Sequence, residues 1–165
     1  MGARALVAGV GNVFLGDDGF GVEVVRHLQP KDVPDGVRVE DFGIRGVHLA
    51  FDLLEPPGLL VIVDAVSRGA APGTLFVIEP DLDGPLPVAD NHSMDVHAVF
   101  TQVRAMGGML PPVRIVGCQP AFLGERMGLS PPVEAAIEPA AALVHKILLD
   151  ELRGADVRAG GGTPR

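Results

Sequence analysis

The fold is decided near the N-terminus by the stretch Gly9-Val10-Gly11-Asn12-Val13-Phe14-Leu15-Gly16-Asp17-Asp18-Gly19-Phe20-Gly21. The run before it, residues 5–8, is short and apolar and leads into glycine, which predicts a buried strand that enters a tight turn. After it, apolar residues recur at helical spacing as far as Leu28. The stretch is therefore a strand-to-helix connection, and in open α/β sheets such connections lie at the edge where ligands bind.

Two adjacent carboxylates, Asp17 and Asp18, lie in this connection. They repel each other and any anion, and a proton, a cation or a metal ion would relieve that repulsion. One of them could cap the following helix or interact with its dipole, but that role does not require both. We therefore expect at least one of the two to be functional.

Composition narrows the class of protein. The chain has 165 residues, a formal net charge of -8 and no basic run, and its only aromatic residues are seven Phe. An acidic chain without stacking side chains is a poor partner for nucleic acid. The single cysteine, Cys118, excludes a disulfide framework, and we expect it to be a buried thiol. Without a signal-peptide pattern or a long apolar segment, we expect a cytoplasmic protein that does not enter membranes.

The rest of the chain alternates predicted strands and helices. We expect helices at residues 19–28, 47–54, 94–105 and 130–152, with Ser130 as an N-cap, and further strands at residues 37–42, 59–64, 74–79 and 113–117. The strand at 74–79 follows its predecessor too closely for a crossover helix, so we expect it to be antiparallel and at an edge. This order predicts a single three-layer α/β/α domain with a mostly parallel sheet of about five strands. The domain should span residues 1–153, and the Gly- and Arg-rich residues 154–165 should form a disordered tail.

Three further side chains could serve a site at that sheet edge. Asp64 ends the most apolar strand and Asp41 lies near the end of the second, whereas His92 lies in a loop before a helix. An Asp at a strand end is as often a helix cap as a ligand, and a lone loop histidine is usually just exposed. Together, however, two carboxylates and an imidazole suit a first-row divalent metal.

Several blocks of the sequence, in the same order, resemble the hydrogenase maturation endopeptidases, which trim the C-terminus of the large subunit of nickel-iron hydrogenases. The resemblance spans residues 5–152, and it rests on Gly9-Val10-Gly11-Asn12, Asp17-Asp18-Gly19-Phe20-Gly21, Asp41-Phe42-Gly43-Ile44-Arg45-Gly46, Val61-Ile62-Val63-Asp64-Ala65, Asn91-His92-Ser93-Met94-Asp95, Val116-Gly117-Cys118-Gln119-Pro120 and Gly128-Leu129-Ser130-Pro131-Pro132-Val133.

The resemblance implies an endopeptidase that cuts a nickel-loaded large-subunit precursor once, after nickel insertion. It implies that Asp18, Asp64 and His92 ligate the nickel, for recognition, catalysis or both, and that other divalent metals could substitute. The family often has Glu at the first position, so Asp18 is one methylene shorter. Asp41 matches a further acidic residue near the cleft, and either Asp17 or Asp41 could be the base that activates a water.

Two other classes stay open at this point. A non-catalytic binding protein or chaperone for a metalloenzyme precursor would share the same ligands but release its partner uncut. A nucleotide-binding module would use the Gly9-x-Gly11 turn, but Phe14 replaces the third glycine of its motif and Asp17-Asp18 would repel a pyrophosphate. We expect a monomer, because the sequence shows no long unpaired apolar face.

Overall fold

A computed structural model describes residues 2–82 and 96–160 of the chain. The strands are β1 (Ala5–Val10), β2 (Val37–Gly43), β3 (Leu60–Ala65), β4 (Leu75–Ile78) and β5 (Val113–Cys118). The helices are α1 (Phe20–His27), α2 (Gly46–Asp52), α3 (Val96–Ala105), α4 (Pro131–Glu134) and α5 (Ile137–Gly160), with short 3-10 turns at Gly16–Gly19 and Pro30–Asp32. The elements form one α/β domain, which confirms the predicted fold class.

The sheet has five strands in the order β2-β1-β3-β5-β4. The pairs β1–β2, β1–β3 and β3–β5 are parallel, whereas β4 runs antiparallel to β5 at the edge. The prediction of an antiparallel edge strand is thus confirmed. The short connection between β3 and β4 leaves no room for the helix that a parallel crossover requires.

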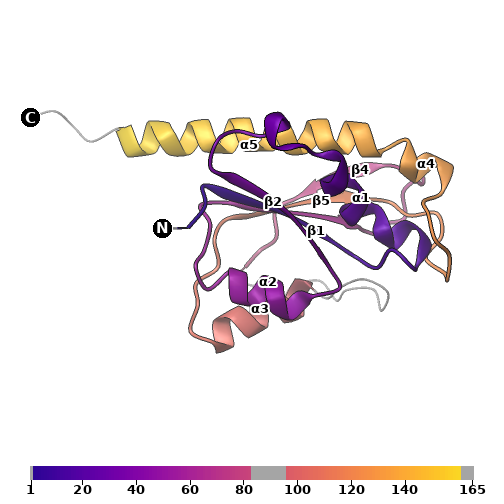
Figure 1. The fold of residues 1–165 in the computed structure, drawn as a ribbon, viewed down its shortest axis with the longest axis horizontal. Coiled ribbons are helices and arrows are strands. Elements are labelled where there is room, and N and C mark those ends of the chain that lie inside the picture. The colour runs from indigo at the N-terminus through magenta and orange to yellow at the C-terminus, as the bar shows by residue number, and fades with distance from the viewer. Residues whose placement is uncertain (1, 83–95, 161–165) are drawn as a thin grey trace, which may run out of the picture.

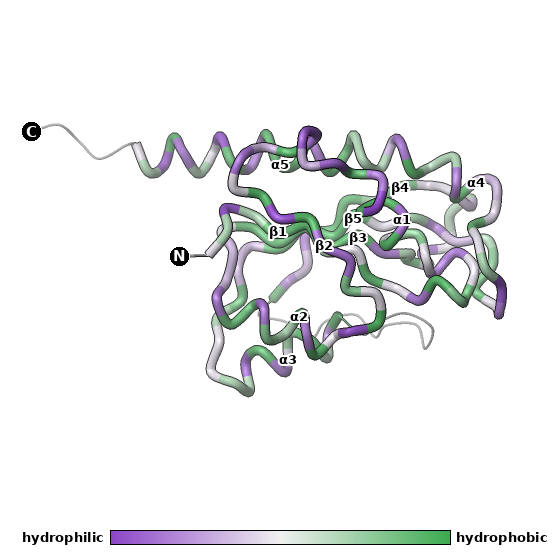
Figure 2. The backbone as a smooth tube through the Cα atoms, in the orientation of Figure 1, coloured by the Kyte–Doolittle hydropathy of each residue, from purple (hydrophilic) through white to green (hydrophobic). Residues whose placement is uncertain are grey.

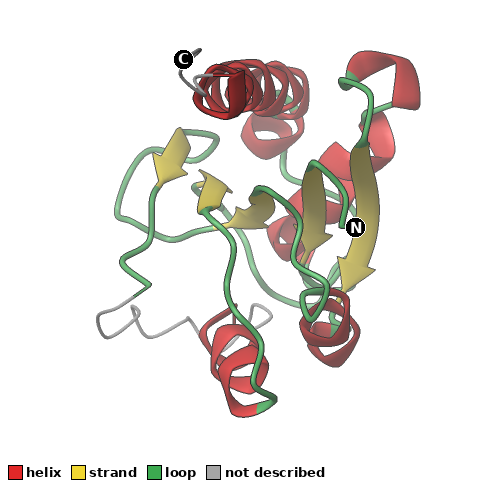
Figure 3. Cartoon of the chain, turned by 90° about the vertical axis from the view of Figure 1, so that its left-hand side faces the viewer, coloured by secondary structure: helices red, strands yellow, loops and turns green. Residues whose placement is uncertain are grey.

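Helices cover both faces of the sheet (Figures 1 and 3). Helices α1 and α5 lie over one face, and α2 and α3 over the other. Successive residues of β1 and β3 therefore point into different cores: Val7 and Val61 pack toward α1 and α5, whereas Leu6 and Leu60 pack toward α2 and α3. This is why the central strands are continuously apolar, as their colouring in Figure 2 shows.

The C-terminal helix differs from the predicted one in two ways. It is broken into α4 and α5, and α5 continues through residues 154–160, where the sequence predicts a disordered tail. Two polar contacts support this extension: Arg4 pairs with Asp156 at 3.0 Å, and the Arg158 Nε donates to the Gly154 carbonyl at 3.1 Å. No helix within the described residues is long and apolar enough to cross a membrane.

Candidate functional site

The carboxyl ends of β1, β2 and β3 bring three predicted site residues to one edge of the sheet. Gly9 of β1 is in register with Asp41 of β2 on one side and with Val63, the residue before Asp64, on the other. Just beyond β1, the Gly11 amide donates to the Gly43 carbonyl at 2.9 Å and so holds the two chain segments together. Parallel strands thus place the connections that follow them side by side.

Gly11 allows the segments that follow β1 and β3 to approach each other closely. Its φ is +127°, a conformation that side chains rarely adopt. A Cβ there would lie 1.9 Å from the Asp18 carbonyl oxygen and 3.5 Å from Oδ1 of Asp64. No residue other than glycine fits, and the close approach places the Asp18 backbone beside the Asp64 carboxylate.

Asp18 and Asp64 form a pair of buried acids. They are only 1% and 5% exposed. The Asn12 amide donates to Oδ2 of Asp18, and the Ala65 amide donates to Oδ1 of Asp64, each at 2.8 Å. Burial, and then the negative charge of Asp18, raises the pKa of Asp64 well above its ordinary value, against the lowering effect of the Ala65 hydrogen bond. Such a site favours an added positive charge.

Asp17 has a different environment from its neighbour. It is fully buried, and it accepts hydrogen bonds from the amides of Ala121, Phe122 and Ser130 and from the Ser130 hydroxyl, at 2.7–3.0 Å. Burial alone would raise the pKa of Asp17, but these four hydrogen bonds lower it below its ordinary value. Asp17 therefore fastens the loop before α4 to the Gly16–Gly19 turn. Ser130 does take the N-cap position, but its side chain serves Asp17 and makes no cap bond.

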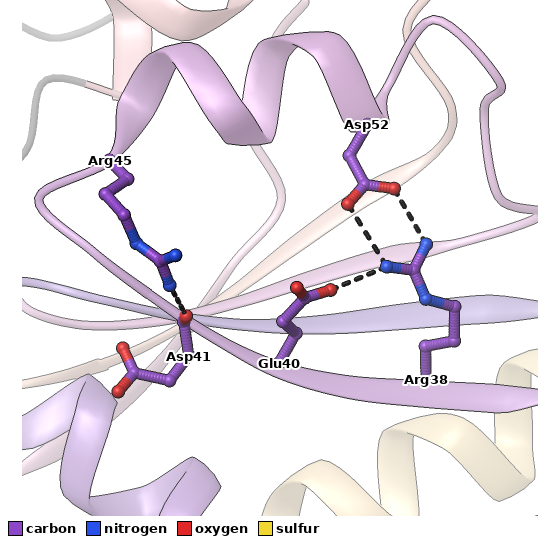
Figure 4. Close-up of polar contacts among 5 residues, drawn as sticks. All are labelled: Arg38, Glu40, Asp41, Arg45 and Asp52. Carbon is purple, nitrogen blue, oxygen red and sulfur yellow. Dashed lines mark hydrogen bonds and ion pairs between the residues drawn. The ribbon is translucent and has the colours of Figure 1, made fainter.

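Asp41 is the accessible acid of the site. Its side chain, 36% exposed, lines a groove of about 300 Å³ together with Gly11, Gly43 and Arg26. The Arg26 Nη2 of α1 lies 3.6 Å from the Asp41 Oδ2. Figure 4 shows that the Asp41 carboxylate points away from Arg45, whose guanidinium instead donates to the Asp41 main-chain carbonyl.

A second polar cluster on β2 lies on the side of the strand that faces α2. There Arg38 pairs with Glu40 at 2.6 Å and with Asp52 of α2 at 2.7 Å (Figure 4). The hydrogen bonds that Arg38 donates to the Asp52 carboxylate raise the pKa of Arg38, so the guanidinium stays charged. This cluster joins α2 to the edge strand, and none of its three residues lines the groove.

The remaining candidates are placed as follows. His92 lies outside the described residues. Within residues 2–82 and 96–160, no group of three or more His, Cys, Asp or Glu side chains is arranged to hold a metal ion. Cys118 is buried, as predicted, and burial raises its pKa to about 11, so it is not a nucleophile at neutral pH.

The sequence did not single out Arg26 and Arg45. Arg45 lies within the block that contains Asp41, so its nearness to the site was readable from the sequence. Arg26, by contrast, meets Asp41 only because α1 packs beside β2, and no local pattern indicates that contact.

Comparison with known proteins agrees with this architecture. The family profile of the hydrogenase maturation proteases matches residues 22–147. The hydrogenase 2 maturation protease of Escherichia coli K12 is 34% identical over 141 residues, which cover 83% of this chain and 85% of the relative. The structure of the hydrogenase maturating endopeptidase HybD from E. coli aligns with 96% of this chain and 94% of the HybD chain, at 32% identity and with a TM-score of 0.71. The crystal structure of a hydrogenase 2 maturation peptidase from a Thaumarchaeota archaeon covers 88% of this chain and 97% of the archaeal chain, at 31% identity and with a TM-score of 0.68. The chain therefore belongs to the hydrogenase maturation proteases and is an endopeptidase.

Proposed function

We propose that the chain removes the C-terminal extension of a nickel-iron hydrogenase large-subunit precursor after nickel insertion. In this proposal Asp18, Asp64 and His92 ligate the nickel that the precursor carries, so that the metal is part of the substrate. The observation that carries the proposal is the pair of buried carboxylates, Asp18 and Asp64, at the carboxyl edge of the sheet.

The energetics of this pair support a cation. A buried carboxylate is costly unless it is protonated or paired, and a second carboxylate nearby adds to that cost. The Asn12 amide donates to Asp18 and the Ala65 amide donates to Asp64, and both carboxylates are almost completely buried. Carboxylate oxygens with an imidazole from His92 suit nickel, and the same donor set also accepts other first-row divalent ions.

The groove beside the pair supports a role in hydrolysis. A divalent metal supplies a Lewis acid that polarises the scissile carbonyl or activates a water. Asp41 is the better placed of the two candidate bases, because it is partly exposed in the groove, whereas both oxygens of Asp17 already accept hydrogen bonds. Arg26 lines the same groove, with its Nη2 3.6 Å from Oδ2 of Asp41.

The proposal is tested by the mass of a purified precursor incubated with this protein, with nickel-loaded and nickel-free precursor in parallel. We expect the loss of a C-terminal peptide from the loaded sample alone. Asp18→Asn should abolish the cleavage, because an amide is a weak ligand for the metal, whereas Asp150→Asn, a matched change at an exposed position of α5, should leave it intact.

Each other result has a distinct meaning. Binding of the loaded precursor without a change in its mass would favour the chaperone class. Full cleavage by Asp18→Asn would refute ligation by this residue. If the protein neither bound nor cut the precursor, the proposed substrate would be wrong.

A further inference from the structure

Helix α2 is apolar on two sides. Its inner side is formed by Leu49 and Ala50, which are fully buried against β1 and β3. Its outer side carries Val47 and Phe51, which are 52% and 57% exposed, and Ile44, just before the helix, is 66% exposed. Val47 and Phe51 are four residues apart in α2 and so lie on the same side of the helix, and Ile44 precedes it by two residues. We call these three side chains the α2 stripe.

The α2 stripe is continuous with the groove. Ile44 belongs to both, since it lines the groove together with Asp41 and Gly43. Phe14, another exposed apolar side chain, lines the same groove. The stripe therefore begins at the groove and continues onto α2, which Figure 1 shows below the sheet together with α3.

A group of exposed apolar side chains beside a groove favours a binding role for this surface. Single exposed apolar residues are ordinary on protein surfaces, but several grouped next to a groove are typical of interaction sites. A permanent occupant of the stripe would also cover Ile44 and so obstruct the groove. The occupant is therefore expected to be the molecule that enters the groove and leaves it again, which is the substrate.

We propose that the α2 stripe docks the folded body of the hydrogenase large-subunit precursor, through an apolar patch on that protein, while the segment to be cut lies in the groove. This inference rests on the proposed function and adds to it a second point of contact. Two linked contacts raise the local concentration of the cut segment at the groove, so the body of the precursor, and not the short segment alone, supplies much of the affinity.

The double variant Val47→Ser/Phe51→Ser tests the inference. Both positions are more than half exposed, so the fold should tolerate the changes. Its matched control is Val77→Ser/Val157→Ser, which removes apolar side chains that are 49% and 75% exposed on β4 and α5. With nickel-loaded full-length precursor, the stripe variant should raise KM at least about tenfold, equivalent to about 1.4 kcal/mol, with kcat unchanged. The control should change neither constant.

The outcomes separate this inference from the proposed function. Equal KM for the stripe variant and the control, with active wild type, would overturn the docking role and leave the proposed function standing. Wild type that sediments as a dimer, with the stripe variant as a monomer, would identify the stripe as a contact between two copies of this chain and overturn the inference. If the wild type bound without cutting, Kd would replace KM in the same comparison. If it neither bound nor cut, both proposals would fall together.

Discussion

Substituting Gly11 by alanine places a methyl group 1.9 Å from the Asp18 carbonyl oxygen. An ordinary contact needs about 3.4 Å, so the Asp18 backbone must retreat by about 1.5 Å or the loop must open. The φ of +127° adds strain of about 1–3 kcal/mol for a residue with a Cβ. Together these effects should lower the free energy of unfolding by at least about 3 kcal/mol. They should also displace the Asp18 carboxylate, and a shift of about 1 Å at a reacting group can reduce the rate about 100-fold.

Gly69→Ala provides the control. Gly69 also has a positive φ, +72°, but a Cβ there meets nothing within 4 Å. Its cost is therefore backbone strain alone, about 1–2 kcal/mol, with no effect on cleavage. Urea denaturation of the two variants measures the difference, and precursor cleavage measures the effect on the site. A Gly11→Ala variant as stable and as active as Gly69→Ala would show that Gly11 does not hold the Asp18 and Asp64 segments together.

Two changes of charge test the contrasting environments of the buried acids. Asp64→Asn should abolish cleavage. In the metal-free protein the same change should raise the free energy of unfolding at pH 7 by about 0.5–2 kcal/mol. The reason is that the pKa of Asp64 is raised in the folded protein, so its charged form destabilises the fold. The gain should vanish toward pH 3.8 and below, where the carboxyl is protonated in both the folded and the unfolded protein, and a loss of stability at pH 7 would contradict this account. Asp17→Asn should instead cost at least about 3 kcal/mol at pH 7, because an amide cannot accept the four hydrogen bonds. The pKa of Asp17 is lowered in the folded protein, so the Asp17 carboxylate stabilises the fold above pH 3.8, and this stabilisation is lost as the pH falls through the folded pKa. If wild type and Asp17→Asn differed in stability as much at low pH as at pH 7, this role of the Asp17 carboxylate would be refuted.

Hydrophobic pattern and connection length were sufficient to predict most of the fold. The apolar runs at β1 and β3 have no polar alternation because helices cover both of their faces, and the short connection before β4 determines its direction. The break between α4 and α5 was missed, although Pro139 indicates it. Proline is tolerated in the first turn of a helix but not in its interior, so a helix that contains Pro139 must start close before it.

The roles within the site were harder to predict. Asp17 and Asp18 are adjacent and chemically identical. Nothing in the local sequence shows that Asp17 binds the loop before α4 and that Asp18 is the candidate ligand. The difference arises from the amides of Ala121, Phe122 and Ser130, which are more than 100 residues away in the chain. The α2 stripe was hidden for a related reason. A short helix that is apolar on both sides gives no periodic signal for which side faces the core.

The features that destabilise the unliganded protein gather at one place. Asp64 is a buried acid with a second acid nearby, Gly11 keeps a backbone conformation that costs entropy to fix, and the α2 stripe leaves apolar surface in water. In the proposed complex a cation would compensate the carboxylates and an apolar surface of the precursor would cover the stripe. The two proposals thus assign the acid pair, the groove and the stripe to one substrate-binding surface, since Gly11 lies beside both acids and Ile44 lines the same groove as Gly11.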